Sequence, residues 1–214
     1  MRRKTPAVAG AVVLLVLPVL SARAVRGAGQ RGPQEAPAPP TPKPVPQKVE
    51  DELARHATAT RPGPEHQWLD PLVGSWKTEI TWYAPPAPPA HLKGTTENRW
   101  ILGGRFLLSE GAAGEGASIV EGMTIYGYDA RERRFSAVGL NNLSARTNQL
   151  SGVYDAVERS FLLTGREFNQ EVGGFVVYRH LLKIHGLDRY TVSVFFELPG
   201  QPPQKLFESS STRR

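Results

Sequence analysis

The chain has 214 residues, a formal charge of +6 and no cysteine, and its length fits one or two domains. Without cysteine, disulfides, thiolate metal sites and lipid modification of an N-terminal cysteine are excluded. Four of the basic residues lie within residues 1–24, and residues 65–214 carry 16 basic and 16 acidic side chains. Nucleic-acid binding depends on clustered Lys and Arg. Because the folded region is neutral and its arginines at 131–134 are typical of a charged hairpin turn, we expect no nucleic-acid partner.

Residues 1–24 predict a signal peptide. Arg-Arg-Lys at positions 2–4 precedes an apolar run from Ala7 to Leu20, which is shorter than the roughly 20 residues of a spanning helix. Ala22-Arg23-Ala24 supplies the small residues that a signal peptidase accommodates. We therefore expect cleavage after Ala24, export to the periplasm or the medium, and no membrane span after cleavage. Retention of the segment as an anchor is the alternative.

Residues 25–61 predict a disordered linker. Seven prolines stand between Gly32 and Gln47, and such a run favours an extended polyproline-like spacer without a core. A short helix is expected within this segment at Lys48–His56. The folded domain is then expected at residues 62–214.

From Gly74 onward the sequence alternates short β-rich runs with turn residues. Tyr190, Val192, Val194 and Phe196 form an apolar face opposite a polar one, which is the period-two pattern of an antiparallel sheet. We predict an all-β domain, an antiparallel up-and-down β-barrel of about ten strands of the lipocalin/calycin type with a short N-terminal helix, because closure removes both sheet edges. A two-layer sandwich is the alternative. The expected strands are 75–83, 93–102, 105–111, 119–128, 134–141, 147–155, 161–167, 174–184, 189–198 and 204–209.

Three segments in succession, 62–82, 94–111 and 125–135, contain a PGPEH…LVGxW opening, a GT…R…LGGRFL hairpin and a GYD turn. With these motifs the sequence resembles the bacterial domain-of-unknown-function family numbered 1579. The resemblance implies a lipocalin-like barrel, often secreted, and implies no established activity. Pro64 and Glu65 are well placed to begin the short helix.

Motifs for common chemistries are missing. The sequence has no H-E-x-x-H pair, no G-x-S-x-G elbow and no G-x-G-x-x-G loop. We therefore nominate no catalytic residue and expect no metal. The most informative single residue is His180, which stands between Tyr178 and Leu182 on an apolar strand face. Facing a cavity, a neutral imidazole there could ligate haem iron or bind a polar head group; facing a packed wall, it would be a hydrogen-bonded structural histidine.

The remaining candidate ligand-binding residues are charged residues near the Gly103-Gly104 turn and three tryptophans. Arg99 and Arg105 could bind a ligand carboxylate, although Glu97 could instead neutralise Arg99. Flat apolar walls could come from three tryptophans that are otherwise ordinary core residues, namely Trp76, Trp82 and Trp100.

These observations support three hypotheses. The first is a barrel that binds a small, mainly apolar molecule between the tryptophans and the Tyr178/His180 strand. The second is an enzyme, a cyclase, isomerase or hydrolase, in which Glu97, Arg99 and His180 converge. The third is a ligand-free interaction domain on a tether. The sequence leaves the ligand and the oligomeric state open.

Overall fold

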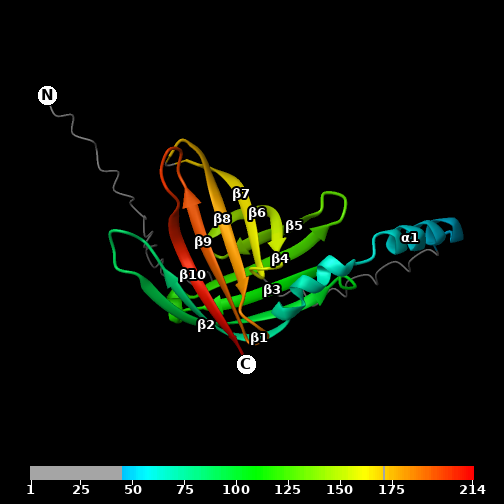
Figure 1. Cartoon of the computed structure of the whole chain (residues 1–214), viewed down its shortest axis with the longest axis horizontal. Helices are drawn as coiled ribbons and strands as arrows, with labels where there is room; N and C mark the ends of the chain where they lie inside the picture. The colour runs from blue at the N-terminus through cyan, green and yellow to red at the C-terminus, as the bar shows by residue number, and fades with distance from the viewer. Residues whose placement is uncertain (1–44, 171) are drawn as a thin grey trace, which may run out of the picture. The chain divides into compact units, whose positions relative to one another are not determined.

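The computed structural model describes residues 45–214 apart from Glu171 (Figure 1). The chain divides into two compact units, Met1–Thr60 and Arg61–Arg214. The predicted signal peptide and the greater part of the proline-rich segment lie outside the described residues.

Helix α1, Gln47–Ala59, is the described part of the first unit and has no buried residue. Its first turn contains Glu50 and its last turn His56, the charge arrangement that a helix dipole favours. Across the part of the chain that the structure describes, no helix combines the length and the hydropathy that a membrane crossing needs.

The second unit contains ten strands, each close to a segment predicted from the sequence. The largest difference is at the last strand, which was expected to end at Ser209 and ends at Arg213. The strands are β1 Gly74–Trp82, β2 Ala90–Ile101, β3 Phe106–Ala113, β4 Val120–Asp129, β5 Arg134–Asn141, β6 Ser144–Asp155, β7 Ser160–Asn169, β8 Gly174–Ile184, β9 Arg189–Glu197 and β10 Gln204–Arg213.

Every strand pairs antiparallel with its neighbour in sequence, and β1 also pairs with β10, so the sheet closes into a barrel (Figure 1). Thr78 of β1 lies opposite Ser211 of β10 at this closure. The predicted ten-stranded up-and-down barrel is confirmed, and the sandwich is excluded. At the β2–β3 hairpin both predicted turn glycines have positive φ, 68° at Gly103 and 80° at Gly104, a conformation that glycine adopts without steric cost.

The short helix expected at Pro64 is the 3₁₀ helix η1, Pro64–Leu72. Its Leu69 and Leu72 are buried in the same apolar cluster as Trp76 and Leu107 from the barrel. The Nε1–H of Trp100 donates to Asp70 at 2.9 Å, which fixes the helix against β2. Helix η1 therefore covers one end of the barrel, and we call the strand segments beside it the covered half.

Candidate functional site

The inner face of the barrel differs between its two halves. In the covered half the inward-facing side chains are almost completely buried, as at Trp76, Leu107 and Phe161. In the other half, which we call the open half, many inward-facing side chains keep part of their surface accessible, although the register directs them away from the outer surface. These partly exposed residues are Ile80, Trp82, Thr96, Thr124, Tyr178, His180, Phe196 and Phe207.

A chain of side-chain hydrogen bonds crosses the inner face between β2 and β9. The hydroxyl oxygens of Thr96 and Thr78 lie 2.9 Å apart, and those of Thr78 and Ser211 lie 3.0 Å apart. Ser211 also interacts with the Tyr190 hydroxyl, and burial, the largest effect, raises the pKa of that phenol. These four side chains form a polar strip across the inner face, which we call the hydroxyl chain.

Asn98 stands at the covered end of the hydroxyl chain. Its Nδ2 donates to the backbone oxygen of Leu72 at 2.7 Å and to the Tyr190 hydroxyl at 3.4 Å. The side chain is only 2% exposed, and its Oδ1 has no hydrogen-bond partner. Sequence reasoning missed this set, because Thr78 and Ser211 are 133 residues apart and only barrel closure brings them together.

Two predicted site residues, Tyr178 and His180, face inward from β8 in the open half. Burial lowers the pKa of His180 to about 4, so its imidazole is neutral at pH 7. Burial also raises the pKa of Tyr178, with a smaller contribution from the nearby Glu167 carboxylate. Both side chains are therefore uncharged groups on the inner face.

A cavity of about 170 Å³ lies beside Tyr178, where β6 and β7 separate. Pairing between these strands stops at Ser151 opposite Thr164, although both strands continue. Beyond this point Arg146 of β6 and Glu167 of β7 form an ion pair of 2.7 Å. The lining residues are Thr147, Asn148, Gln149, Leu150, Gly165, Arg166, Glu167 and Tyr178.

Haem fits this inner face poorly. His180 could supply a neutral imidazole to iron, but haem carries two propionates that need cationic or hydrogen-bonding partners. Among the described inward-facing side chains of the open half, the one cation is Arg146, and Glu167 already neutralises it. A small uncharged molecule suits the wall better.

The three predicted tryptophans have different environments. Trp76 is 1% exposed, donates Nε1–H to Leu72 O at 2.8 Å and contacts the Tyr190 ring edge-on at 4.7 Å, so it is part of the covered-half core. Trp100 packs against the same core. Trp82 faces inward in the open half and stacks on Phe207 with ring centroids 5.7 Å apart, and it alone is placed to contact an interior ligand.

The other predicted residues do not face the interior. Glu97 and Arg99 point outward from β2, where Glu97 accepts a hydrogen bond from Ser75 and Arg99 is ion-paired with Glu110 rather than with Glu97. Arg105, beside the turn, donates to the carbonyl of Leu102 at 3.4 Å. The expected Glu97–Arg99 pair is therefore wrong. The enzyme hypothesis also loses its basis, because Glu97 and Arg99 lie on the opposite side of the barrel wall from His180.

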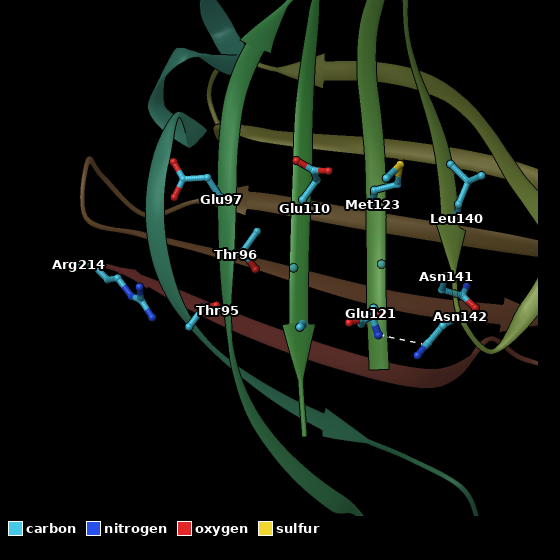
Figure 2. Close-up of a pocket in the computed structure, with 13 residues that line it drawn as sticks. Thr95, Thr96, Glu97, Glu110, Glu121, Met123, Leu140, Asn141, Asn142 and Arg214 are labelled. Carbon is cyan, nitrogen blue, oxygen red and sulfur yellow. Dashed lines mark hydrogen bonds between the residues drawn. The ribbon is translucent and has the colours of Figure 1, made fainter. Parts of the chain in front are cut away.

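A groove of about 560 Å³ lies over the outer face of β2–β5. Figure 2 shows Glu97, Glu110, Met123 and Leu140 in one row across these four strands. Two of the carboxylates are already engaged, by Ser75 and Arg99. In the described chain no group of three or more His, Cys, Asp or Glu side chains is arranged to hold a metal ion.

Comparison with protein families gives one match, a model described as "Protein of unknown function (DUF1579)" over residues 61–213. The chain belongs to this family. The DUF1579 resemblance inferred from the PGPEH, LGGRFL and GYD motifs is thereby confirmed. Comparison of this DUF1579 chain with curated proteins gives no match.

Solved structures resemble the DUF1579 barrel. The Mycobacterium tuberculosis protein Rv2717c superposes with a TM-score of 0.54 at 17% identity, over 72% of this chain and 99% of its own. The S-type phycobiliprotein lyase CPES of Guillardia theta gives a TM-score of 0.47 at 11% identity, over 80% of this chain and 98% of its own. At these identities the likeness to Rv2717c shows the calycin-like barrel fold alone.

The outer surface of the DUF1579 barrel also carries an apolar row. Val153, Leu162 and Leu181 are direct cross-strand neighbours on β6, β7 and β8, and they are 53%, 40% and 36% exposed. Such a row is the surface that the interaction-domain hypothesis would use.

Proposed function

We propose that this protein is an exported barrel that binds a small, mainly apolar molecule against the inner face of its open half. The observation that carries the proposal is the contrast between the two halves. Inward-facing residues beside η1 are buried, whereas those of the open half, Trp82 and His180 among them, keep accessible surface. Apolar interior surface that is open to a ligand is a common property of small-molecule sites.

The gap between β6 and β7 supports a small ligand. Its volume of about 170 Å³ is close to that of a cavity that holds one benzene-sized molecule, so the gap can admit one ring or one alkyl chain of a longer ligand. Tyr178 lines this gap from the inside. In the proposal the gap is the entry to the inner wall.

Export belongs to the proposal because of the leader at residues 1–24, whose charge and apolar length are those of a signal peptide. Expression of the full chain in a bacterial host, followed by fractionation and N-terminal sequencing, tests it. The expected mature protein begins at Val25 in the periplasm or the medium. Recovery of an intact N-terminus in the cytoplasm contradicts export without affecting the binding proposal.

Binding is tested with Nile red, a neutral apolar dye whose fluorescence rises in an apolar site. Gly139 lies on the inner face of β5, and a Cβ there would meet no atom closer than 3.8 Å. We expect Gly139→Phe to fill interior space and to weaken Nile red binding at least about tenfold. Its neighbour Leu140 faces outward and is 39% exposed, so Leu140→Phe is the matched control and should bind as the wild type does.

Equal binding by the wild type and both variants places the dye on the outer surface and contradicts the proposal, as does failure of the wild type to bind. Native mass spectrometry of protein purified from its host provides a second test, in which a co-purified small molecule is expected and should be lost in Gly139→Phe. A haem absorption band that appears on haem addition and disappears in His180→Ala would show that His180 binds haem, and it would contradict the proposal of a small apolar ligand.

A further inference from the structure

We propose that the ligand of the inner wall is electrically neutral and presents a polar group, such as a carbonyl oxygen, to the hydroxyl of Thr96. This inference rests on the proposed binding function and adds the chemistry of the ligand to it. Two independent observations carry it, the accessible hydroxyl at the end of the hydroxyl chain and the charge of the inner face.

The hydroxyl chain is anchored at Asn98. The backbone oxygen of Leu72 can only accept, so the Asn98 atom 2.7 Å away is the amide nitrogen. The same nitrogen faces the Tyr190 hydroxyl at 3.4 Å, and an amide nitrogen can only donate. The Tyr190 oxygen therefore accepts from Asn98, and this contact ties the chain to the backbone of η1.

From Tyr190 the chain continues through three hydroxyls. Ser211 interacts with the Tyr190 hydroxyl, and its own oxygen lies 3.0 Å from that of Thr78. The oxygens of Thr78 and Thr96 lie 2.9 Å apart. A hydroxyl can donate one hydrogen and accept others, and hydroxyls linked in a row polarise one another.

Thr96 is the last member of the chain. Its side chain is only partly buried on the inner face. The neighbouring position on β3 is Gly111, where a Cβ would lie 2.9 Å from the Thr96 hydroxyl oxygen, so the missing side chain leaves the hydroxyl accessible. A polar group of a ligand placed there extends a chain that begins at the backbone of η1.

The inner face does not offer a charge to balance an anion. Among the described inward-facing residues the arginines are Arg146 and Arg213. Arg146 is paired with Glu167, while Arg213 donates to the carbonyls of Val73 and Pro71 and lies over the Trp76 ring at 4.3 Å. A carboxylate against this wall would lose its hydration for a single hydroxyl contact, which is unfavourable.

Ketones, aldehydes, esters and amides with an apolar body therefore fit the wall, and free fatty acids do not. The test is displacement of Nile red from the full chain at pH 8 by three compounds of equal length, 2-decanone, decane and decanoate. We expect 2-decanone to displace the dye at a concentration at least about tenfold below that of ionised decanoate.

The matched variants are Thr96→Val, which removes the hydroxyl while keeping the shape, and Thr95→Val on the outer face of the same strand. A hydrogen bond contributes about 1 kcal/mol, so Thr96→Val should weaken 2-decanone about fivefold and leave decane unchanged. Thr95→Val should change neither. Thermal unfolding of both variants checks that the barrel is intact.

The outcomes separate this inference from the binding proposal. If neither Nile red nor any of the three compounds binds, the proposed function itself fails. If the dye binds but decanoate displaces it as well as 2-decanone does, the ligand is not restricted to neutral molecules and the inference is overturned. Equal 2-decanone affinity in Thr96→Val and the wild type overturns the role of Thr96.

Discussion

The guanidinium of Arg146 and the carboxylate of Glu167 lie 2.7 Å apart across the gap in which β6 and β7 no longer pair. Elsewhere around the barrel the backbone ladders hold neighbouring strands together over most of their length. Here one partly exposed ion pair and a hydrogen bond from Arg146 to the carbonyl of Phe168 at 3.5 Å take their place. The β6–β7 ladder has five paired positions and is the shortest of the barrel, and its unpaired end lies beside the proposed entry.

Removing the ion pair should loosen the gap without unfolding the barrel. We expect Arg146→Gln to increase the association and dissociation rates of Nile red in stopped-flow fluorescence, and to lower the free energy of unfolding by less than about 1 kcal/mol because the pair is partly exposed. Hydrogen exchange of the 147–150 segment should rise, a result that does not depend on ligand binding.

Arg179 provides the control for that experiment, since its ion pair with Glu197 joins β8 and β9 where these strands are fully paired. Arg179→Gln should leave both dye rates and the exchange of residues 147–150 unchanged. If the two variants behave alike, the β6–β7 gap is not the entry.

Gly165 follows the last paired position of β6 and β7, Ser151 opposite Thr164. A Cβ at Gly165 would lie 2.3 Å from the carbonyl oxygen of Gln149, a distance that forces the backbones apart. Gly165→Ala should therefore destabilise the domain by about 1–3 kcal/mol in chemical denaturation. At Gly174 a Cβ would have no atom within 4 Å, so Gly174→Ala should be close to neutral, and an equal loss in both variants would contradict this account.

Substitution of Trp76 should mainly lower stability, whereas substitution of Trp82 should mainly weaken dye binding. Trp76→Ala removes a buried ring, its hydrogen bond to Leu72 and its contact with Tyr190, and should cost about 3–5 kcal/mol. Trp82→Ala removes a half-buried ring stacked on Phe207, and it should cost less stability while weakening Nile red. Urea unfolding and dye titration of the two variants measure both effects, and a larger stability loss at Trp82 would be inconsistent with the two-half interior.

His180 should make the domain less stable in mild acid. Its pKa is lowered to about 4 in the folded state by burial, against about 6.5 in an unfolded chain. The unfolded chain therefore binds more protons between these values, so stability is complete above about pH 6.5 and falls as the pH is lowered toward 4. The loss should reach at most about 3 kcal/mol, reduced by the partial exposure of the ring.

The variant His180→Gln isolates this contribution, because the carboxylates and the other histidines titrate equally in both proteins. The difference in unfolding free energy between wild type and variant should change between pH 7.5 and pH 4.5. A difference that stays constant over this range would show that the imidazole is not buried.

Local patterns were sufficient to predict the strands and the helix over the barrel end. Period-two alternation fixed β9 as Arg189–Glu197 to within one residue, and Pro64 marked the start of η1. The face of each strand residue is harder to predict: Arg99 flanks the Gly103-Gly104 turn and Glu97 shares its face, yet both point outward. Pairing partners are set by register, and register does not appear in a single strand's sequence.

The hydroxyl chain could not be predicted for a related reason. Thr78, Thr96 and Ser211 are ordinary small polar residues on their own strands. Thr78 contacts Ser211 only because β1 pairs with β10 when the barrel closes. The same holds for the gap beside Tyr178, because the end of the β6–β7 pairing has no turn residue to signal it. The signal that would have helped is the alternating pair of inward-facing serines on β10, Ser209 and Ser211.

The pairing of β1 with β10 also constrains when the domain can form. The strand that follows η1 has its second partner in Gln204–Arg213, so the barrel stays an open sheet with two unpaired edges until the last strand has been synthesised. Contacts that span nearly the whole domain slow folding and prolong exposure of such edges. Late closure thus favours the proposed export, because a slowly closing barrel leaves time for translocation of the unfolded chain.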